Sequence, residues 1–292
     1  MWDQWLLSLI SGVGVGSMYG LTALGFHITY RVSRTVNFAQ GTCLMLAAVA
    51  AFTMQVTWQW PAALAAVLAL VLCAFWGAGV EWFVVRPFTQ KGSDAWLMST
   101  LALGLLLENA VLLSFGKDPR GMTSSMQHIA WMVSGVKISA QQILIPVVGL
   151  TLAMVLTWVF KYTSVGRSWT AISLNPEAAS LMGIPTQRFV TLSFALSGVL
   201  AGIAGLLIAP LYTVSAGMGT LFGLKAFAAA IVGGMDSALG VMVAGTAMGL
   251  IEALAISVLG STYTQMISFG LTIAILCLKP HGLFGQPTVK KV

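Results

Sequence analysis

The chain has 292 residues, of which 58% are apolar and 8% are charged, with a mean hydropathy of +0.91 and a formal net charge of +6. Because a soluble globular domain carries roughly 25% charged residues, this composition indicates an integral membrane protein. The membrane spans of such a chain leave no room for a soluble catalytic domain.

Four long segments contain no Asp, Glu, Lys or Arg, namely residues 4–30, 35–80, 189–224 and 253–278. A hydrocarbon core about 30 Å thick requires roughly 20 apolar residues in a helix, so each segment can hold one or two spans. We therefore predict an all-α, polytopic fold with about eight or nine crossings. In chain order, the predicted spans are residues 5–29, 36–56, 61–84, 95–115, 142–160, 189–211, 221–235, 238–259 and 263–278.

One predicted span, residues 221–235, is too short for a straight crossing and is bracketed by glycines, among them Gly233 and Gly234. Irregular backbone at membrane depth occurs where it faces protein or a water-lined route. We therefore predict a short broken or re-entrant helix here. A kinked helix is the alternative.

The positive charges predict the orientation of the chain in the membrane. With the N-terminus outside, ten Lys and Arg residues fall on the inner side and three on the outer side. Inner loops carry the excess of Lys and Arg, so we expect the N-terminus outside and the C-terminus inside. The inner set is Arg31, Arg34, Arg86, Lys91, Lys161, Arg167, Arg188, Lys279, Lys290 and Lys291, and the outer set is Lys117, Arg120 and Lys137.

The sequence also contains a weak internal repeat. Shifting it by 186 residues places Ser11–Tyr30 over Ser197–Ala216 with six identical residues, in a chain rich in Gly, Ala and Leu. The two segments would cross in opposite directions, as in the inverted repeats of transporters. We therefore expect a single transmembrane domain over residues 1–292, with repeat halves at about 1–160 and 189–292 and an inner loop at 161–188.

The inner loop contains the signals of a short helix. Asn175 suits the N-cap, Pro176 the first helical position and Glu177 the positive helix end. Gly183 and Pro185 then end the helix. A helix of about two turns is marginally stable alone in water, so we expect it to pack either on its own bundle or on a partner.

At this loop the chain resembles a known family. Glu177-Ala178-Ala179, followed by Leu181 and Gly183, is similar to the cytoplasmic coupling loop of ABC importer permeases. Four further stretches, in the same order along nearly the whole chain, are similar to the branched-chain amino-acid permease family of the LivH type. They are Val36–Gly41, Leu224–Ser237, Gly249–Leu254 and Lys279–Gly285.

This resemblance implies a permease subunit of an ATP-driven importer in the cytoplasmic (inner) membrane of a bacterial-type cell. It implies a second, related permease subunit in a heterodimer, two cytoplasmic ATP-binding subunits and an extracytoplasmic substrate-binding protein. ATP and Mg would be bound by those partners and no cofactor by this chain, in agreement with the lack of a Gly-x-x-x-x-Gly-Lys-Ser/Thr phosphate loop. By family default the cargo is a branched-chain amino acid or a related small amide or carboxylate.

Two positions depart from the family pattern. Gln40 stands where the family usually has His after Asn-Phe-Ala, and Thr42 stands where it usually has an acid after the Gly. Both lie in Asn37–Thr42, a segment that we expect to line or brace the translocation pathway through Asn37, Phe38, Gln40, Gly41 and Thr42. The usual cargo is therefore open to question, whereas the coupling loop is unaffected.

Three charged residues are expected within the bilayer: Glu108, Lys225 and Glu252. A charge at the bilayer centre costs about 2.5–3.5 kcal/mol on insertion scales, so such residues are functional candidates. Counting along the helices places all three at a similar depth. They either brace a gate or contact cargo, or they form a buried pair with only a packing role. Near other span ends, Glu81 is expected at the interface, only loosely within reach of Arg86.

Two other function classes compete with the permease. A passive channel for a small neutral solute such as urea would have no use for the loop at Glu177–Gly183. An intramembrane enzyme would need a catalytic motif, and the spans contain no Ser/His pairing, no His-Glu-x-x-His and no paired aspartates. We expect no catalytic residues, no metal site and no nucleic-acid partner, and membrane lipid around the chain.

Overall fold

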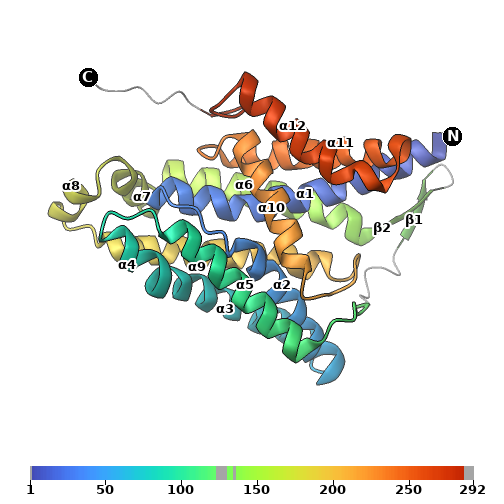
Figure 1. The fold of residues 1–292 in the computed structure, drawn as a ribbon, viewed down its shortest axis with the longest axis horizontal. Coiled ribbons are helices and arrows are strands. Elements are labelled where there is room, and N and C mark those ends of the chain that lie inside the picture. The colour runs from blue at the N-terminus through green and yellow to red at the C-terminus, as the bar shows by residue number, and fades with distance from the viewer. Residues whose placement is uncertain (1, 123–129, 134–135, 286–292) are drawn as a thin grey trace.

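A computed structural model describes residues 2–122, 130–133 and 136–285 (Figure 1). Helices dominate this part of the chain, and one small hairpin accompanies them, with β1 (Ala130–Val133) paired antiparallel to β2 (Val136–Ser139). The helices are α1 (Trp2–Ser33), α2 (Gln40–Phe52), α3 (Ala62–Gly79), α4 (Arg86–Thr89), α5 (Trp96–Phe115), α6 (Ala140–Tyr162), α7 (Ser164–Leu174), α8 (Pro176–Leu181), α9 (Thr186–Ile208), α10 (Met218–Gly233), α11 (Ala238–Leu259) and α12 (Thr264–Leu278). Two π-helical turns, η1 (Thr53–Thr57) and η2 (Val80–Val85), continue α2 and α3, and a short turn, η4 (Ser261–Tyr263), precedes α12.

The structure confirms the polytopic all-α prediction. Within the described residues, eight helices are long and apolar enough to cross a membrane, and α10 is a shorter apolar helix of 16 residues. Each predicted span overlaps one of these nine helices. The orientation of the termini, the inverted repeat and the domain boundaries stay predictions.

The core forms around α1, which packs along α11 through small residues. A Cβ atom on Gly16 would lie 2.7 Å from the carbonyl oxygen of Gly245, and one on Gly20 would lie 3.0 Å from that of Met242. Contacts this close are available only where both helices present glycine or another small residue. The backbones of α1 and α11 therefore touch over several turns, and α6, α9 and α10 pack around them.

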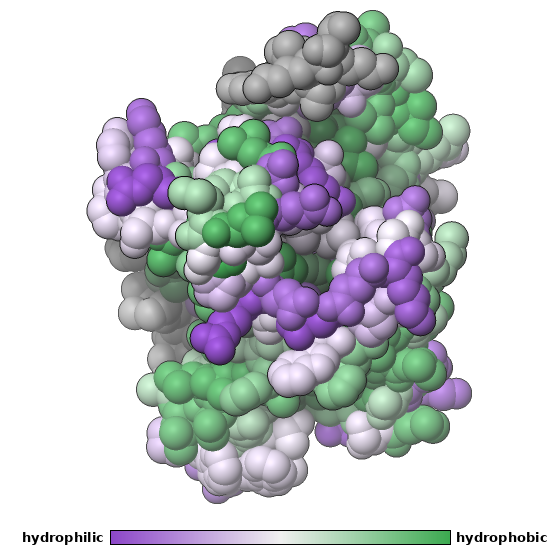
Figure 2. Space-filling view, turned by 90° about the vertical axis from the view of Figure 1, so that its left-hand side faces the viewer, coloured by the Kyte–Doolittle hydropathy of each residue, from purple (hydrophilic) through white to green (hydrophobic). Residues whose placement is uncertain are grey.

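The elements divide along the long axis of the molecule (Figure 1). The β1–β2 hairpin lies at one end, beside the start of α1, whereas α4, α7 and α8 lie at the other. Figure 2 looks onto the end that carries α8, where hydrophilic residues gather across the face and apolar residues cover its flanks. The inner loop predicted at 161–188 is part of this polar end.

Candidate functional site

A pocket of about 130 Å³ lies between α2, α5 and α10. Three predicted pathway residues line it, namely Phe38, Gly41 and Thr42. The other walls are mostly apolar, with Leu101 and Leu105 from α5 and Phe227 from α10. The pocket therefore offers a small solute apolar surface with few polar groups, of which the hydroxyls of Thr42 and Thr220 are two.

Glycines bring α2 and α10 together beside this pocket. A Cβ atom on Gly219 would lie 2.8 Å from the carbonyl oxygen of Gly41, and one on Gly223 would lie 2.8 Å from the Gly41 Cα atom. Any side chain at these positions would force the helices apart. The pocket thus depends on backbone-to-backbone packing that a Gly in α2 and two in α10 permit.

Gln40 does not line the pocket and instead braces three helices. Its Nε2 donates to the carbonyl oxygen of Ser197 on α9 at 2.8 Å. The Ser197 hydroxyl lies 2.7 Å from Gln40 Oε1 and 2.8 Å from the Gly25 carbonyl oxygen on α1. Gln40 is fully buried, so its amide replaces solvent as the partner for these groups.

Asn37 shapes the start of α2. Its side-chain Oδ1 accepts the Ala39 N–H at 3.0 Å, which is a local turn contact typical of Asn. Its Nδ2 is buried and has no hydrogen-bond partner among the described residues. The next residue, Phe38, reaches the pocket and packs against Phe227 with ring centroids 5.0 Å apart.

The three charged residues predicted at similar depth separate into a pair and a single acid. Lys225 on α10 forms an ion pair with Glu252 on α11, and the two side chains are only 6% and 9% exposed. Two hydroxyls complete the cluster: Tyr19 lies 3.2 Å from Lys225 Nζ, and Ser268 donates to Glu252 Oε2 at 3.2 Å. Of the three charged residues, Lys225 and Glu252 thus form a buried pair. Its role in transport stays a prediction.

Glu108 does not join this cluster. Its carboxylate accepts a hydrogen bond from Thr220, which lines the pocket between α5 and α10. The two acids therefore contact different sides of α10, Glu108 through Thr220 and Glu252 through Lys225. Their similar depth stays a prediction.

Gly233 and Gly234 lie apart from the pocket, at the turn between α10 and α11. Gly234 has φ of +83°, a conformation that favours glycine. A Cβ atom on Gly233 would lie 2.6 Å from the Gly240 carbonyl oxygen. The Leu283 N–H donates to the Val232 carbonyl oxygen at 2.7 Å, so this turn also anchors residues 279–285.

The short helix predicted in the inner loop is present as α8, and its coupling role stays a prediction. Asn175 is its N-cap and accepts the Ala178 N–H at 3.0 Å, Pro176 begins the helix, and Gly183 follows it with φ of +83°. Pro176, Glu177 and Ala178 are exposed, and Leu181 is 88% exposed.

The inner face of α8 packs on its own chain. Ala179 is only 5% exposed, so α8 packs through Ala179 and leaves Leu181 outside. Helix α7 precedes α8 and was not predicted. It begins after Thr163, whose hydroxyl caps the Gly166 N–H, and Trp169 anchors it by donating to the Phe189 carbonyl oxygen at 3.0 Å.

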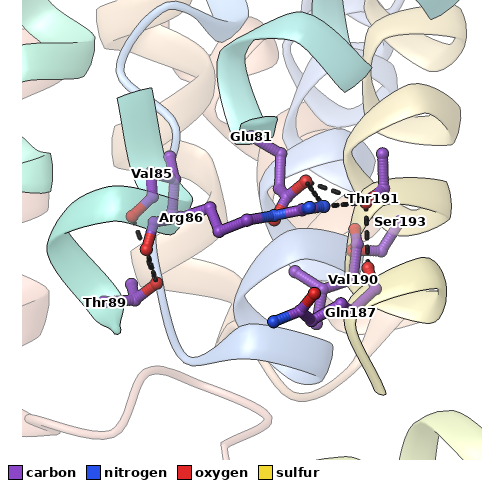
Figure 3. Close-up of polar contacts among 8 residues, drawn as sticks. All are labelled: Glu81, Val85, Arg86, Thr89, Gln187, Val190, Thr191 and Ser193. Atoms are coloured by element: carbon purple, nitrogen blue, oxygen red, sulfur yellow. Dashed lines mark hydrogen bonds and ion pairs between the residues drawn. The ribbon is translucent and has the colours of Figure 1, made fainter. Parts of the chain in front are cut away.

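Figure 3 shows a second ion pair, between Glu81 and Arg86, and corrects the expectation that they meet only loosely. Arg86 Nε donates to Glu81 Oε1 at 3.0 Å and Nη2 donates to Oε2 at 2.8 Å. The π-helical turn η2 explains this geometry, because the Arg86 N–H bonds to the Glu81 carbonyl five residues earlier. In an α-helix, residues five apart point to different sides. In this π-helical turn, the side chains of Glu81 and Arg86 lie on the same side and meet.

Thr191 on α9 completes this cluster. Its hydroxyl lies 2.8 Å from both Glu81 Oε2 and Arg86 Nη2. Glu81 is 3% exposed, so it is buried between helices instead of lying at the interface. The pair thus ties the end of α3 to the first turns of α9, the helix that follows α8.

Comparison with known proteins places these features in a family. A family model described as branched-chain amino acid transport system / permease component matches residues 8–276. The high-affinity branched-chain amino acid transport permease BraD of Pseudomonas aeruginosa is 32% identical, over 99% of this chain and 98% of its own length. LivH of Escherichia coli is 30% identical, over 98% and 97%, and the E. coli ribose import permease RbsC is 26% identical, over 90% and 82%. No solved structure matches.

Proposed function

The chain belongs to the family of branched-chain amino acid permease components, and from this membership we propose that it is one membrane subunit of an ATP-driven importer. In this proposal the chain passes a small solute from an extracytoplasmic binding protein to the cytoplasm. A related permease subunit pairs with it, and two ATP-binding subunits on the cytoplasmic side bind ATP and Mg. Its N-terminus lies outside, and α8 lies inside.

The exposed surface of α8 is the observation that carries this proposal. A large apolar side chain in water is ordinary when isolated, but here Leu181 and Met182 are 88% and 84% exposed, side by side at the tip of a capped helix. Because Ala179 packs inward, α8 has a fixed base and an apolar tip that is free to enter a cleft of another protein. A channel that works alone would have no use for this tip, so α8 and the family both favour the permease over a passive urea channel.

The cargo that we propose is a branched-chain amino acid or a related small amide or carboxylate. Support comes from the pocket between α2, α5 and α10, whose lining is apolar apart from a few hydroxyl groups. Thr42 lines this pocket, and its hydroxyl is already occupied by the Ala39 carbonyl oxygen at 2.7 Å. The pocket therefore suits the apolar side chain of such a cargo, and it offers few polar groups to the charged ends.

Substitution of Leu181 tests the proposal. Leu181→Ser removes an apolar contact surface from α8, and because the side chain is solvent-exposed the fold should not change. We expect ATP-driven uptake and co-purification of the ATP-binding subunits to fall by about tenfold, as for loss of a buried interface leucine. Leu278→Ser is the matched control, since Leu278 is 83% exposed at the end of α12. Wild-type uptake in Leu181→Ser would contradict the coupling role of α8.

A further inference from the structure

A groove on the outer flank of the bundle lies beside the Glu81–Arg86 pair. It has a volume of about 560 Å³ and runs between η2 and the first turns of α9. Trp82, Arg86, Gln187, Arg188, Thr191 and Leu192 line it. It is separate from the pocket between α2, α5 and α10 and from α8.

The groove has an apolar and aromatic rim. Trp82 lines the groove and is 60% exposed, and its ring stacks on that of its neighbour Phe83 with centroids 6.2 Å apart. Leu192 is 43% exposed one turn deeper along α9. Exposed aromatic rings at the end of a membrane span are typical of the headgroup region. We therefore expect the groove to open toward the lipid headgroups.

Two guanidinium groups supply positive charge to the same groove. Arg86 is held in place by Glu81 and Thr191, and its Nη1 has no hydrogen-bond partner among the described residues. Arg188 is exposed, and its side chain makes no hydrogen bond or ion pair with the described residues. With one carboxylate and two guanidinium groups, the groove carries a net positive charge and has N–H donors that are free to bind an anion.

We propose that this groove binds the phosphodiester headgroup of an anionic glycerophospholipid. Arginine is suited to phosphate because its planar N–H groups can bind two oxygens at once. Basic pockets between membrane helices on the cytoplasmic side bind anionic headgroups in this way. Arg188 contacts the phosphate, Arg86 presents its free Nη1 beside it, and the acyl chains lie along Trp82 and Leu192.

This proposal rests on the proposed function in one respect, the orientation of the chain, which places the groove in the inner leaflet. A bound lipid would bridge η2 and α9 on the surface of the bundle, while Glu81 and Thr191 join the same two elements on the side that faces the core. Anionic lipid should therefore stabilise the chain through the contact between α3 and α9.

The test uses the full-length permease, purified in neutral detergent without its ATP-binding subunits, so that it is independent of uptake. Native mass spectrometry and thermal unfolding are measured during titration with phosphatidylglycerol, phosphatidylethanolamine, phosphatidylcholine or inorganic phosphate. We expect saturable binding of phosphatidylglycerol and a rise in the unfolding midpoint. Arg188→Gln should bind it about tenfold more weakly, equal to about 1.4 kcal/mol.

Arg167→Gln is the matched control, because Arg167 is an exposed arginine on α7 that lies outside the groove. It should bind phosphatidylglycerol like the wild type. Equal binding by wild type and Arg188→Gln, or equal stabilisation by phosphatidylethanolamine, would overturn the proposal. So would equal stabilisation by inorganic phosphate, which would indicate a free-anion site, or loss of lipid binding on pairing with the second permease subunit, which would indicate a protein interface.

Discussion

The Lys225–Glu252 pair lies in the middle of the bundle, whereas the Glu81–Arg86 pair lies at the end of α3 near the α8 end of the molecule. The first has side chains 6% and 9% exposed, and the second has a buried carboxylate at 3% and a guanidinium at 22%. Each pair neutralises a charge within the helices of an apolar chain. Of the four side chains, only that of Arg86 is substantially exposed at the surface of the bundle. The difference predicts how each site responds when one partner is removed.

The surroundings of the two pairs explain this difference. Lys225 and Glu252 are enclosed by α1, α10, α11 and α12, and their further partners are the hydroxyls of Tyr19 and Ser268. An uncompensated charge there would stay buried. Arg86 lies over the exposed ring of Trp82 at 5.3 Å, close to a polar end of the molecule, so its charge can turn toward water or a headgroup.

The largest effect is expected for Lys225→Met. Removal of the ammonium leaves Glu252 buried and unpaired, so the free energy of unfolding should fall by about 3–5 kcal/mol. Adding Glu252→Gln should restore most of the loss, whereas Glu108→Gln should not, because Glu108 faces Thr220. Thermal unfolding in detergent measures these values, with Lys279→Met, an exposed lysine, as control.

Uptake in the same variants tells whether Lys225 is more than a structural residue. A purely structural Lys225 predicts that the double variant Lys225→Met/Glu252→Gln regains both stability and uptake. A residue that contacts cargo or a gate predicts regained stability without uptake. Wild-type stability and uptake in Lys225→Met alone would contradict both roles.

A smaller effect is expected for Glu81→Gln. The amide keeps the shape of the carboxylate and can accept one of the hydrogen bonds from Arg86, and the freed charge on Arg86 can turn outward. We expect a loss of about 1–3 kcal/mol, the cost of a hydrogen bond to a charged group. The unfolding midpoints of Glu81→Gln and Glu252→Gln should be compared directly. An equal or larger loss in Glu81→Gln would show that access to the surroundings does not separate the two pairs.

The smallest effect is expected for Thr191→Val, which keeps the side-chain shape and removes the hydroxyl that joins α9 to the Glu81–Arg86 pair. Because the ion pair itself remains, the loss should be about 1 kcal/mol. Thr151→Val on α6 is the control, since that exposed hydroxyl bonds only within its own helix. Identical midpoints for both variants would mean that Thr191 contributes nothing to the contact between α3 and α9.

Much of the fold could be predicted because it follows from local composition. Long apolar runs, four of them free of charge, predicted the eight long apolar helices among the described residues. Asn175, Pro176 and Gly183 predicted α8 through capping rules that involve only neighbouring residues. Two elements, α7 and η2, were not predicted, because their sequences carry only a weak local signal. Helix α7 is short, and its buried face consists of Gly166, Trp169 and Ile172, spaced three residues apart. The turn η2 has no sequence signal that we recognised, so the spacing of Glu81 and Arg86 was misjudged.

The sequence alone placed Glu108, Lys225 and Glu252 within helical spans and predicted their depth, since depth is counted in residues along a helix. Only the tertiary structure decided which way each side chain faces, because the rotation of a helix about its axis is set by packing. Contacts such as Gly16 with Gly245 and Gly41 with Gly219 lock those rotations. They turn Glu252 toward Lys225 and leave Glu108 beside Thr220, and they place Gln40 against Ser197 and away from the pocket. Helix packing thus decides which charged and polar residues meet, and hydropathy along the chain does not encode that packing.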